Sequence, residues 1–227
     1  PKPQTPNPKP QSQINSRRIR NEEPTQKAGL YSTESKIINM NENRVNKELQ
    51  MMKTQKDVEV WLVGSNIRHW KAVIKGAPDT VYDGGKFQID IKLPENYPYT
   101  PPKMQFDTKI WHPNVSSQTG AICLDVLKDE WSPALSIRTA LLSIQVLMAV
   151  PEPDSPQDAV VASQYKENRQ LFNKTAIEWT KTYASLDSLK NDKIAKLTGM
   201  GFTADQATKA LEKAGWDESA AIQSLLG

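Results

Sequence analysis

Residues 94–135 read PENYPYTPPKMQFDTKIWHPNVSSQTGAICLDVLKDEWSPAL, and the motifs in this stretch are the most informative about the fold of the chain. It opens on a proline-rich corner, which breaks regular structure because proline lacks an amide donor and fixes its own φ angle. It then holds His-Pro-Asn at 112–114, the only cysteine of the chain, Cys123, and Trp-Ser-Pro at 131–133. We expect residues 111–135 to form a long ordered loop. It should end at Ser136, because this serine and the strongly apolar run after it have the pattern of a capped helix.

The stretches on either side of this loop predict an α+β domain of residues 40–184. Val45, Leu49 and Met52 recur at helical spacing and predict a helix over residues 40–55. Four strand-like stretches bounded by turn residues follow, and their pattern favours an antiparallel sheet. They are Val58–Val63, His69–Ile74, Phe87–Leu93 and Lys103–Phe106. The helices expected after the loop are 137–150, capped by Ser136, then Gln157–Tyr165 and Glu167–Tyr183.

The two ends of the chain differ from this domain in composition. Residues 1–39 are rich in proline and basic side chains, and we expect a disordered tail because they have little apolar surface to bury. Residues 185–227 are rich in Ala, Lys, Leu and Asp at close to helical spacing, and Thr203 and Asp217 are candidate N-caps. We expect this C-terminal segment to be a separate domain of three short helices.

Composition excludes several classes of protein. The chain has 227 residues with one cysteine and two histidines, too few for an internal disulfide, and no metal site is expected. No apolar run approaches the roughly 20 residues that a membrane span needs, so no membrane role is expected. The first 36 residues hold seven Lys/Arg against three Asp/Glu, so the tail accounts for the net charge of +3 and nucleic-acid binding is not expected. A lone thiol fits a reducing compartment, which is the cytoplasm, the nucleus or both.

Cys123 lies in an apolar setting, where a cysteine is more often a buried small hydrophobe than a nucleophile. The motifs around it favour the second interpretation. They are the turn Tyr82–Gly85, the corner Pro94–Lys103, His112–Asn114, Gly120–Asp125 and Trp131–Pro133. In this order and spacing they resemble the catalytic domain of ubiquitin-conjugating enzymes over about residues 40–184.

The C-terminal segment carries a second resemblance. Met200, Gly201 and Phe202, with the terminal pair Leu225 and Leu226, resemble the ubiquitin-associated (UBA) domain, a three-helix ubiquitin binder. The same Met and Phe beside a glycine could simply cap a helical hairpin. Taken as a whole, the chain is similar to those conjugating enzymes that carry a C-terminal UBA domain.

The first resemblance implies a mechanism. Cys123 would accept ubiquitin from an activating enzyme as a thioester and pass it to lysine amines, building polyubiquitin chains, because a thiol is nucleophilic and also leaves readily. No cofactor is expected on this chain, since the activating enzyme uses the ATP. Asn114 would donate an amide N–H to the tetrahedral oxyanion; alternatively, it only braces its loop. His112 and Pro113 would hold a tight turn, with general-base catalysis by His112 as the less favoured alternative.

The resemblance also implies residues that position the acceptor lysine. Asp125 and Asp129 would guide the amine, or they are merely solvated. Many family members have an aspartate where this chain has Ser155, with Asp154 one residue earlier. A hydroxyl orients an amine by hydrogen bonding but does not take its proton at pH 7, so we expect Ser155 to tune activity.

Partner surfaces follow from the same resemblance. Tyr99, Pro133 and Ala134 would form the apolar patch that ubiquitin ligases bind, although ordinary loop packing explains them equally well. The basic side chains Arg44 and Lys47 on the first helix would meet the activating enzyme, or form a solvated face. The UBA residues named above would bind ubiquitin, and the remaining partners are protein substrates with acceptor lysines.

Two other classes of protein compete with this prediction. A cysteine protease would pair Cys123 with a histidine and an orienting residue, but His112 and Asn114 are two residues apart and cannot easily both serve it. A non-catalytic ubiquitin receptor or scaffold would keep the fold and act through its UBA domain. The presence of Cys123 argues against the receptor, because inactive variants usually lack that residue.

Overall fold

The computed structural model describes residues 41–55 and 57–227. The predicted disordered tail at 1–39 lies outside the described residues, as does the first residue of the helix expected over 40–55. Within the described part, residues 41–53 are helical, and Val45, Leu49 and Met52 are buried on one face of this first helix. None of the helices in the described part is long and apolar enough to cross a membrane.

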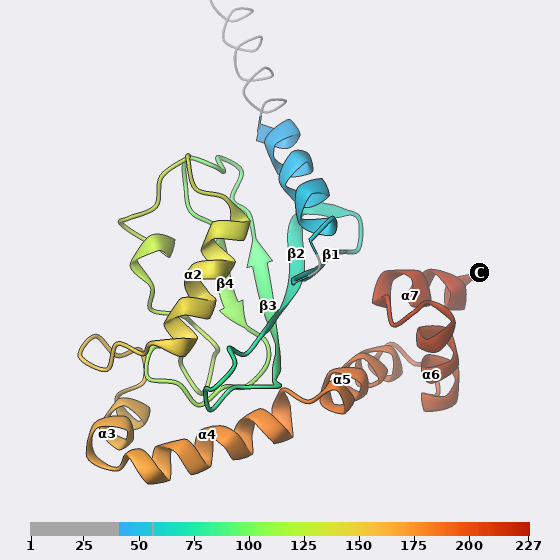
Figure 1. The fold of residues 1–227 in the computed structure, drawn as a ribbon. Coiled ribbons are helices and arrows are strands. Elements are labelled where there is room, and N and C mark those ends of the chain that lie inside the picture. The colour runs from blue at the N-terminus through green and yellow to red at the C-terminus, as the bar shows by residue number, and fades with distance from the viewer. Residues whose placement is uncertain (1–40, 56) are drawn as a thin grey trace, which may run out of the picture. The chain divides into compact units, whose positions relative to one another are not determined.

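The predicted four-stranded antiparallel sheet is confirmed. Its strands are β1 (Glu59–Val63), β2 (Asn66–Lys75), β3 (Lys86–Lys92) and β4 (Lys103–Phe106). They pair in the order β1-β2-β3-β4, each antiparallel to its neighbour (Figure 1). Strand β2 is longer than predicted at both ends: Asn66 pairs with Val63 of β1 across the hairpin, and Lys75 pairs with Lys86 of β3.

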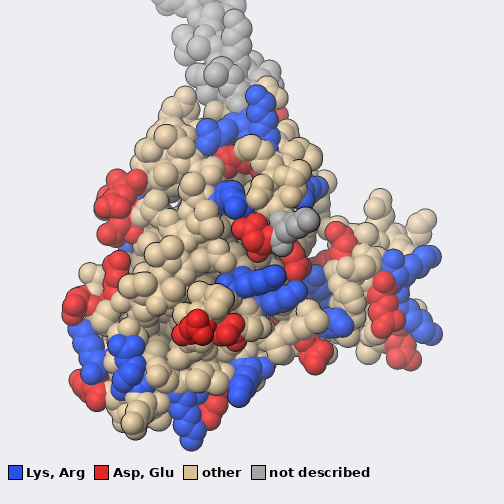
Figure 2. Space-filling view, in the orientation of Figure 1, with Lys and Arg blue, Asp and Glu red and all other residues tan. Residues whose placement is uncertain are grey.

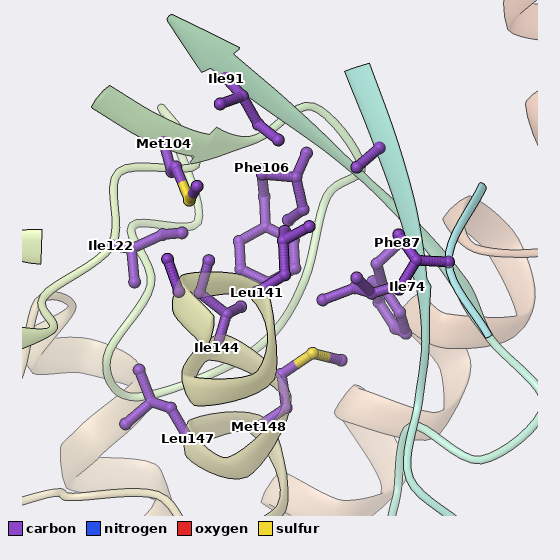
Figure 3. Packing of buried hydrophobic residues seen from close by; sticks show 14 of the residues in the cluster. Ile74, Phe87, Ile91, Met104, Phe106, Ile122, Leu141, Ile144, Leu147 and Met148 are labelled. Atoms are coloured by element: carbon purple, nitrogen blue, oxygen red, sulfur yellow. The ribbon is translucent and has the colours of Figure 1, made fainter. Parts of the chain in front are cut away.

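Helix α2 (Ile137–Ala149) packs against one face of this sheet and closes the core (Figures 1 and 3). Ser136 caps it as predicted, in a capping box with Thr139. Figure 3 shows Leu141 and Ile144 of α2 facing Phe106 of β4 and Ile122 of the loop before the cysteine. Alternation along β3 puts Phe87, Ile89 and Ile91 on this inner face. They belong to the same core cluster as Ile122, so the loop before the cysteine is packed against the core.

Two helices complete the α+β domain. Helix α3 (Ala159–Glu167) begins two residues later than predicted because the Asp158 side chain caps it, accepting from the amide of Val161. Helix α4 (Arg169–Tyr183) likewise begins after an Asn168 cap, and buries Phe172 in the main core. Both corrections have one cause: the capping side chain, rather than the apolar pattern, decides where a helix starts.

The C-terminal segment folds into the three predicted helices, α5 (Leu186–Gly199), α6 (Ala204–Lys213) and α7 (Glu218–Leu226). Thr203 and Asp217 cap the last two as expected. The helices share a small apolar cluster of their own, separate from the main core. Its fully buried members are Leu197, Ala207, Leu211 and Ala221.

Charged side chains are interspersed on the face of the described residues seen in Figure 2. Lys and Arg lie among Asp and Glu there in small groups rather than as one field of a single sign. This pattern agrees with the sequence, in which the tail accounts for the net charge.

Candidate active site

The cysteine is held by a narrow hairpin-like loop. Val115 bridges to Ile122, and Ala121 bridges to Gln105 of β4, so the loop is attached to the edge of the sheet. Gly120 turns the chain with a φ of 73°, and a Cβ there would lie 1.9 Å from the carbonyl oxygen of Phe106. Only glycine tolerates both the angle and the contact, so this residue brings the loop against β4.

The thiol of Cys123 is half-buried at the end of this loop. The Cys123 amide donates to the carbonyl oxygen of Asn114 at 2.9 Å, which fixes the residue beside the His-Pro-Asn turn. Ile122, the preceding residue, points into the core toward α2 in Figure 3. The backbone at Cys123 is therefore anchored by its own amide and by the buried Ile122, while its side chain stays partly exposed.

A lysine lies beside the sulfur. After Cys123 the chain makes the 3₁₀ turn η1 (Asp125–Leu127), which brings Lys128 back toward the thiol. Lys128 Nζ lies 3.4 Å from Cys123 Sγ, close enough to donate a hydrogen bond to sulfur. Lys128 is exposed, so it also faces solvent.

Asn114 is 1 % exposed, and its side chain braces the segment of residues 152–155. Its Nδ2 donates to the carbonyl oxygens of Glu152 at 2.8 Å and Ser155 at 3.0 Å, and its Oδ1 accepts from the Glu152 amide at 2.8 Å. Both of its N–H groups are thus engaged. This geometry corresponds to the bracing role. For the oxyanion role, Asn114 would have to give up one of these two hydrogen bonds and donate that N–H to the oxyanion.

His112 is fully buried and forms a structural link. Its Nδ1 accepts from the Asn114 amide at 3.0 Å, so Nε2 carries the proton and donates to the carbonyl oxygen of Leu147 in α2 at 3.0 Å. Both ring nitrogens are used and neither faces Cys123. This arrangement favours the predicted structural role over general-base catalysis.

The state of His112 makes stability depend on pH. Burial lowers the pKa of His112 to about 4, against about 6.5 for a free histidine, so the folded chain binds fewer protons than the unfolded chain between these values. The free energy of unfolding should therefore fall by up to about 3 kcal/mol as the pH is lowered from 6.5 to 4. Urea unfolding at several pH values measures this slope. In His112→Gln the slope should flatten, and an equal slope in both proteins would contradict the assignment.

The predicted acceptor-positioning residues surround this site unevenly. Asp154 is exposed and paired with Lys166 of α3 at 2.7 Å, so its charge is partly engaged. Ser155 is exposed on the segment that Asn114 braces. Asp125 and Asp129 are exposed in and after η1. All four stay predictions for the acceptor role, and Ser155 has the most direct structural connection to Asn114.

Comparisons with known proteins agree with this geometry. The sequence profile described as ubiquitin-conjugating enzyme matches residues 44–180, which is more than half of the chain. The chain is 50% identical over 186 residues to ubiquitin-conjugating enzyme E2 27 of Arabidopsis thaliana, covering 81% of this chain and 96% of that one. It is 48% identical over 176 residues to human ubiquitin-conjugating enzyme E2 K, covering 76% and 88% respectively.

The chain belongs to the ubiquitin-conjugating enzyme family. A solved structure, the E2 domain of a Toxoplasma gondii ubiquitin-conjugating enzyme, is similar with a TM-score of 0.61 and 57% identity, covering 63% of this chain and 98% of that one. The UBA/TS-N domain profile matches residues 190–225, so the second predicted domain is confirmed as well. The protein is a conjugating-enzyme transferase with a C-terminal UBA domain, as the sequence predicted.

In this conjugating enzyme the predicted ligase patch is exposed. Tyr99 is 67% exposed. Pro133 and Ala134, which follow Trp131 in the sequence, are exposed as well. Trp131 Nε1 donates to the carbonyl oxygen of Pro98 at 2.7 Å, which ties the two parts of the patch together. Its use by a ligase stays a prediction, but its exposure and connection fit a binding surface better than ordinary loop packing.

The two basic residues of the first helix differ in their surroundings. Lys47 is exposed and available to a partner. Arg44 is half-buried and donates to the carbonyl oxygens of Pro133 at 3.3 Å and Leu135 at 2.8 Å while pairing with Glu48. Arg44 thus has an internal structural role that the sequence did not indicate, and Lys47 is the better candidate for contact with an activating enzyme.

The predicted ubiquitin-binding residues of the UBA domain fall into two groups. Met200 and Leu226 are exposed, Leu226 by 73%. Phe202 and Leu225 are partly buried against the cluster of the domain, and Gly201 turns the chain between α5 and α6 with a φ of 99°. The exposed pair is therefore the accessible part of the predicted surface.

Two further features of the enzyme were not predicted from the sequence. One is the contact of Lys128 with the thiol, for which the chain gives no signal beyond the short separation of the two residues. The other is an exposed apolar face on α2, where Leu142 and Val146 lie one turn apart and Val146 is 63% exposed. This face could have been found, because α2 is apolar nearly all round and has more apolar positions than one buried face uses.

Proposed function

We propose that the chain accepts ubiquitin on Cys123 as a thioester and transfers it to lysine amines, building polyubiquitin chains. The activating enzyme supplies ubiquitin and uses the ATP, so the chain itself binds no cofactor. In the transfer step the lysine nitrogen attacks the thioester carbonyl, the C–N bond forms, the C–S bond breaks, and the amine proton leaves to solvent. The proposed setting is the cytoplasm, the nucleus or both.

The single observation that carries this proposal is the setting of the thiol. Cys123 has a backbone fixed by hydrogen bonding and a partly exposed side chain, at the point where the Gly120 loop meets the segment braced by Asn114. A cysteine kept only for packing would be buried. A protease would need a histidine facing the sulfur, whereas both nitrogens of His112 are bonded elsewhere.

A charging assay tests the proposal. The full chain is incubated with activating enzyme, ATP and ubiquitin, and the products are separated on non-reducing and reducing gels. The expected result is a shift of one ubiquitin mass that reductant removes and that Cys123→Ala lacks. A well-folded chain that shows no shift would favour the alternative function, a ubiquitin receptor acting through its UBA domain.

Lys128 should become a competing acceptor in the same assay. Its amine is 3.4 Å from the sulfur, so intramolecular transfer has the advantage of proximity over free lysine. We expect a second ubiquitin adduct that resists reductant and accumulates slowly after charging. Lys128→Arg keeps the positive charge but removes the nucleophile, so this adduct should largely disappear while charging continues.

The matched control for that prediction is Lys103→Arg, which changes an exposed lysine at the start of β4 and should leave the adduct in place. Mass spectrometry of the digested adduct locates the isopeptide bond. An adduct of equal yield in Lys128→Arg would show that another lysine is the acceptor.

We infer that the UBA domain retains the growing chain. Its exposed residues Met200 and Leu226 form a small surface, which implies weak binding that tethering to the catalytic domain strengthens by raising the effective concentration. Leu226→Asp should therefore shorten the ubiquitin chains made in a fixed time several-fold without changing charging. Gel analysis of chain length measures the effect, with exposed Ser224→Asp as the charge-matched control. Unchanged chain length in Leu226→Asp would assign this surface another role.

A further inference from the structure

A buried carboxylate in the first helix lies outside the chemistry at Cys123. Glu48 is 2 % exposed. Its oxygens accept from the Tyr97 hydroxyl at 2.8 and 3.0 Å and from the Ile137 amide at 2.8 Å, and the Arg44 guanidinium pairs with it. Burying a carboxylate without hydrogen-bond partners costs free energy, so the folded state favours keeping these donors next to Glu48.

The donors belong to separate parts of the chain. Ile137 is the first residue of α2, so its amide has no acceptor inside the helix. The dipole of the helix also favours an anion at this end. Tyr97 lies in the proline-rich corner, two residues before Tyr99. Burial and the neighbouring carboxylate of Glu48 raise the pKa of Tyr97, so its hydroxyl remains a donor. Glu48 therefore joins the first helix, the corner and the start of α2 at one point.

The same cluster supports the backbone of the exposed patch. Arg44, fixed by Glu48, donates to the carbonyl oxygens of Pro133 and Leu135 at 3.3 and 2.8 Å. The Tyr97 ring packs on Trp131 with centroids 5.9 Å apart. The patch of Tyr99, Pro133 and Ala134 is thus exposed to solvent. Its backbone is connected, through Arg44 and Tyr97, to the carboxylate of Glu48.

We propose that Glu48 is a positioning residue for ligase-dependent ubiquitin transfer: it holds the patch of Tyr99, Pro133 and Ala134 in the shape that a ligase binds. The partner is a ligase domain that presents apolar side chains to this patch, and a preformed patch binds more tightly because less order is lost on association. Glu48 touches neither ubiquitin nor the reacting atoms. The inference rests on the proposed function of the chain.

Glu48→Gln provides the main test. Glutamine keeps the shape of the side chain but turns an NH₂ group toward a donor, and the loss of a charge-assisted hydrogen bond is worth about a factor of ten. The KM for a ligase domain should rise about tenfold, while kcat at saturating ligase, the rate of charging and ligase-free discharge to L-lysine should stay within about twofold. Tyr97→Phe keeps the ring packing and loses only the hydroxyl, so its KM should rise by a smaller factor of about three.

The probes are recombinant ligase domains of the RING and U-box types, selected for accelerating discharge of the charged parent chain. The control for lost stability is Ile91→Val, a core substitution in β3 that removes none of the Glu48 hydrogen bonds and should lower Tm and leave the KM for the ligase unchanged. Tyr97→Phe keeps the test valid if Glu48→Gln folds poorly.

The outcomes separate the inference from the proposed function. An unchanged KM in folded Glu48→Gln and Tyr97→Phe, or a rise in KM in Ile91→Val as well, would overturn the positioning role. If the parent charges but no ligase domain accelerates its discharge, the patch has no ligase role and the inference fails while the thioester function stands. If the parent does not charge, the proposed function itself fails.

Discussion

Replacing Cys123 by serine is expected to convert the labile ubiquitin adduct into one that reductant does not cleave and hydroxide does. The serine oxygen occupies the accessible position of the sulfur, and an oxyester forms there in place of the thioester. An alkoxide is a much poorer leaving group than a thiolate, so transfer to lysine should fall by at least about a hundredfold. Gels run with reductant, with and without a brief alkaline treatment, identify the bond.

Cys123→Ala is the matched control, because it fills part of the same space and offers no nucleophile. Its folded state should match the parent by circular dichroism, and it should show no adduct of either kind. A reductant-sensitive adduct in Cys123→Ala is ruled out by the sequence, which has no second cysteine. Persistent lysine transfer in either variant would place the nucleophile elsewhere and remove the basis of the proposed mechanism.

Asn114→Ala is expected to slow discharge to lysine by about 10²–10³ while charging remains measurable. The loss of one oxyanion donor has an effect of that size. The structure adds a second cause, because Asn114 makes three hydrogen bonds that brace residues 152–155 beside Ser155. Single-turnover discharge of purified thioester to L-lysine measures the rate directly, without interference from the activating enzyme.

The two causes can be separated with a variant that weakens a neighbouring contact between the cysteine loop and the start of α3 and leaves Asn114 intact. The carboxylate of Asp158 accepts from the amide and the hydroxyl of Ser117 at 3.0 and 2.6 Å, joining the loop before the cysteine to the start of α3. Asp158→Asn still caps the helix but weakens this connection. If Asp158→Asn slows discharge as much as Asn114→Ala does, bracing explains the effect. If only Asn114→Ala is slow, the oxyanion role is supported.

Local sequence signals placed most of the elements correctly. Ser136 and Thr203 cap helices where expected, because capping depends on residues three positions apart. Phe87, Ile89 and Ile91 alternate into the core because successive side chains of a strand point to opposite faces. Helices α3 and α4 each begin two residues later than predicted, since the cap residues Asp158 and Asn168 fall inside the predicted helix bounds.

The roles of single side chains in the site were harder to predict than their positions. The His-Pro-Asn motif predicts a structural role for His112, and the hydrogen bonds of both its ring nitrogens agree with that role. The sequence predicts that Arg44 lies on a partner surface, because it shows the charge of this residue but not its long-range hydrogen-bond partners. Those partners, Pro133 and Leu135, are 89 and 91 residues away, and no local pattern links residues at such separations.

The sequence by itself determined the family and the two folded domains and indicated Cys123 as the candidate nucleophile, because each depends on short motifs or on periodicity within one element. The tertiary structure alone decided which partners Asn114, Lys128 and Glu48 contact. It bonded Asn114 to residues 38 and 41 positions away, set Lys128 beside the thiol, and gathered Tyr97 and Ile137 around Glu48 from 49 and 89 positions away. The physical reason is that a hydrogen bond or ion pair depends on distance in space, which the packing of the sheet, the loop and α2 sets only when the chain is folded.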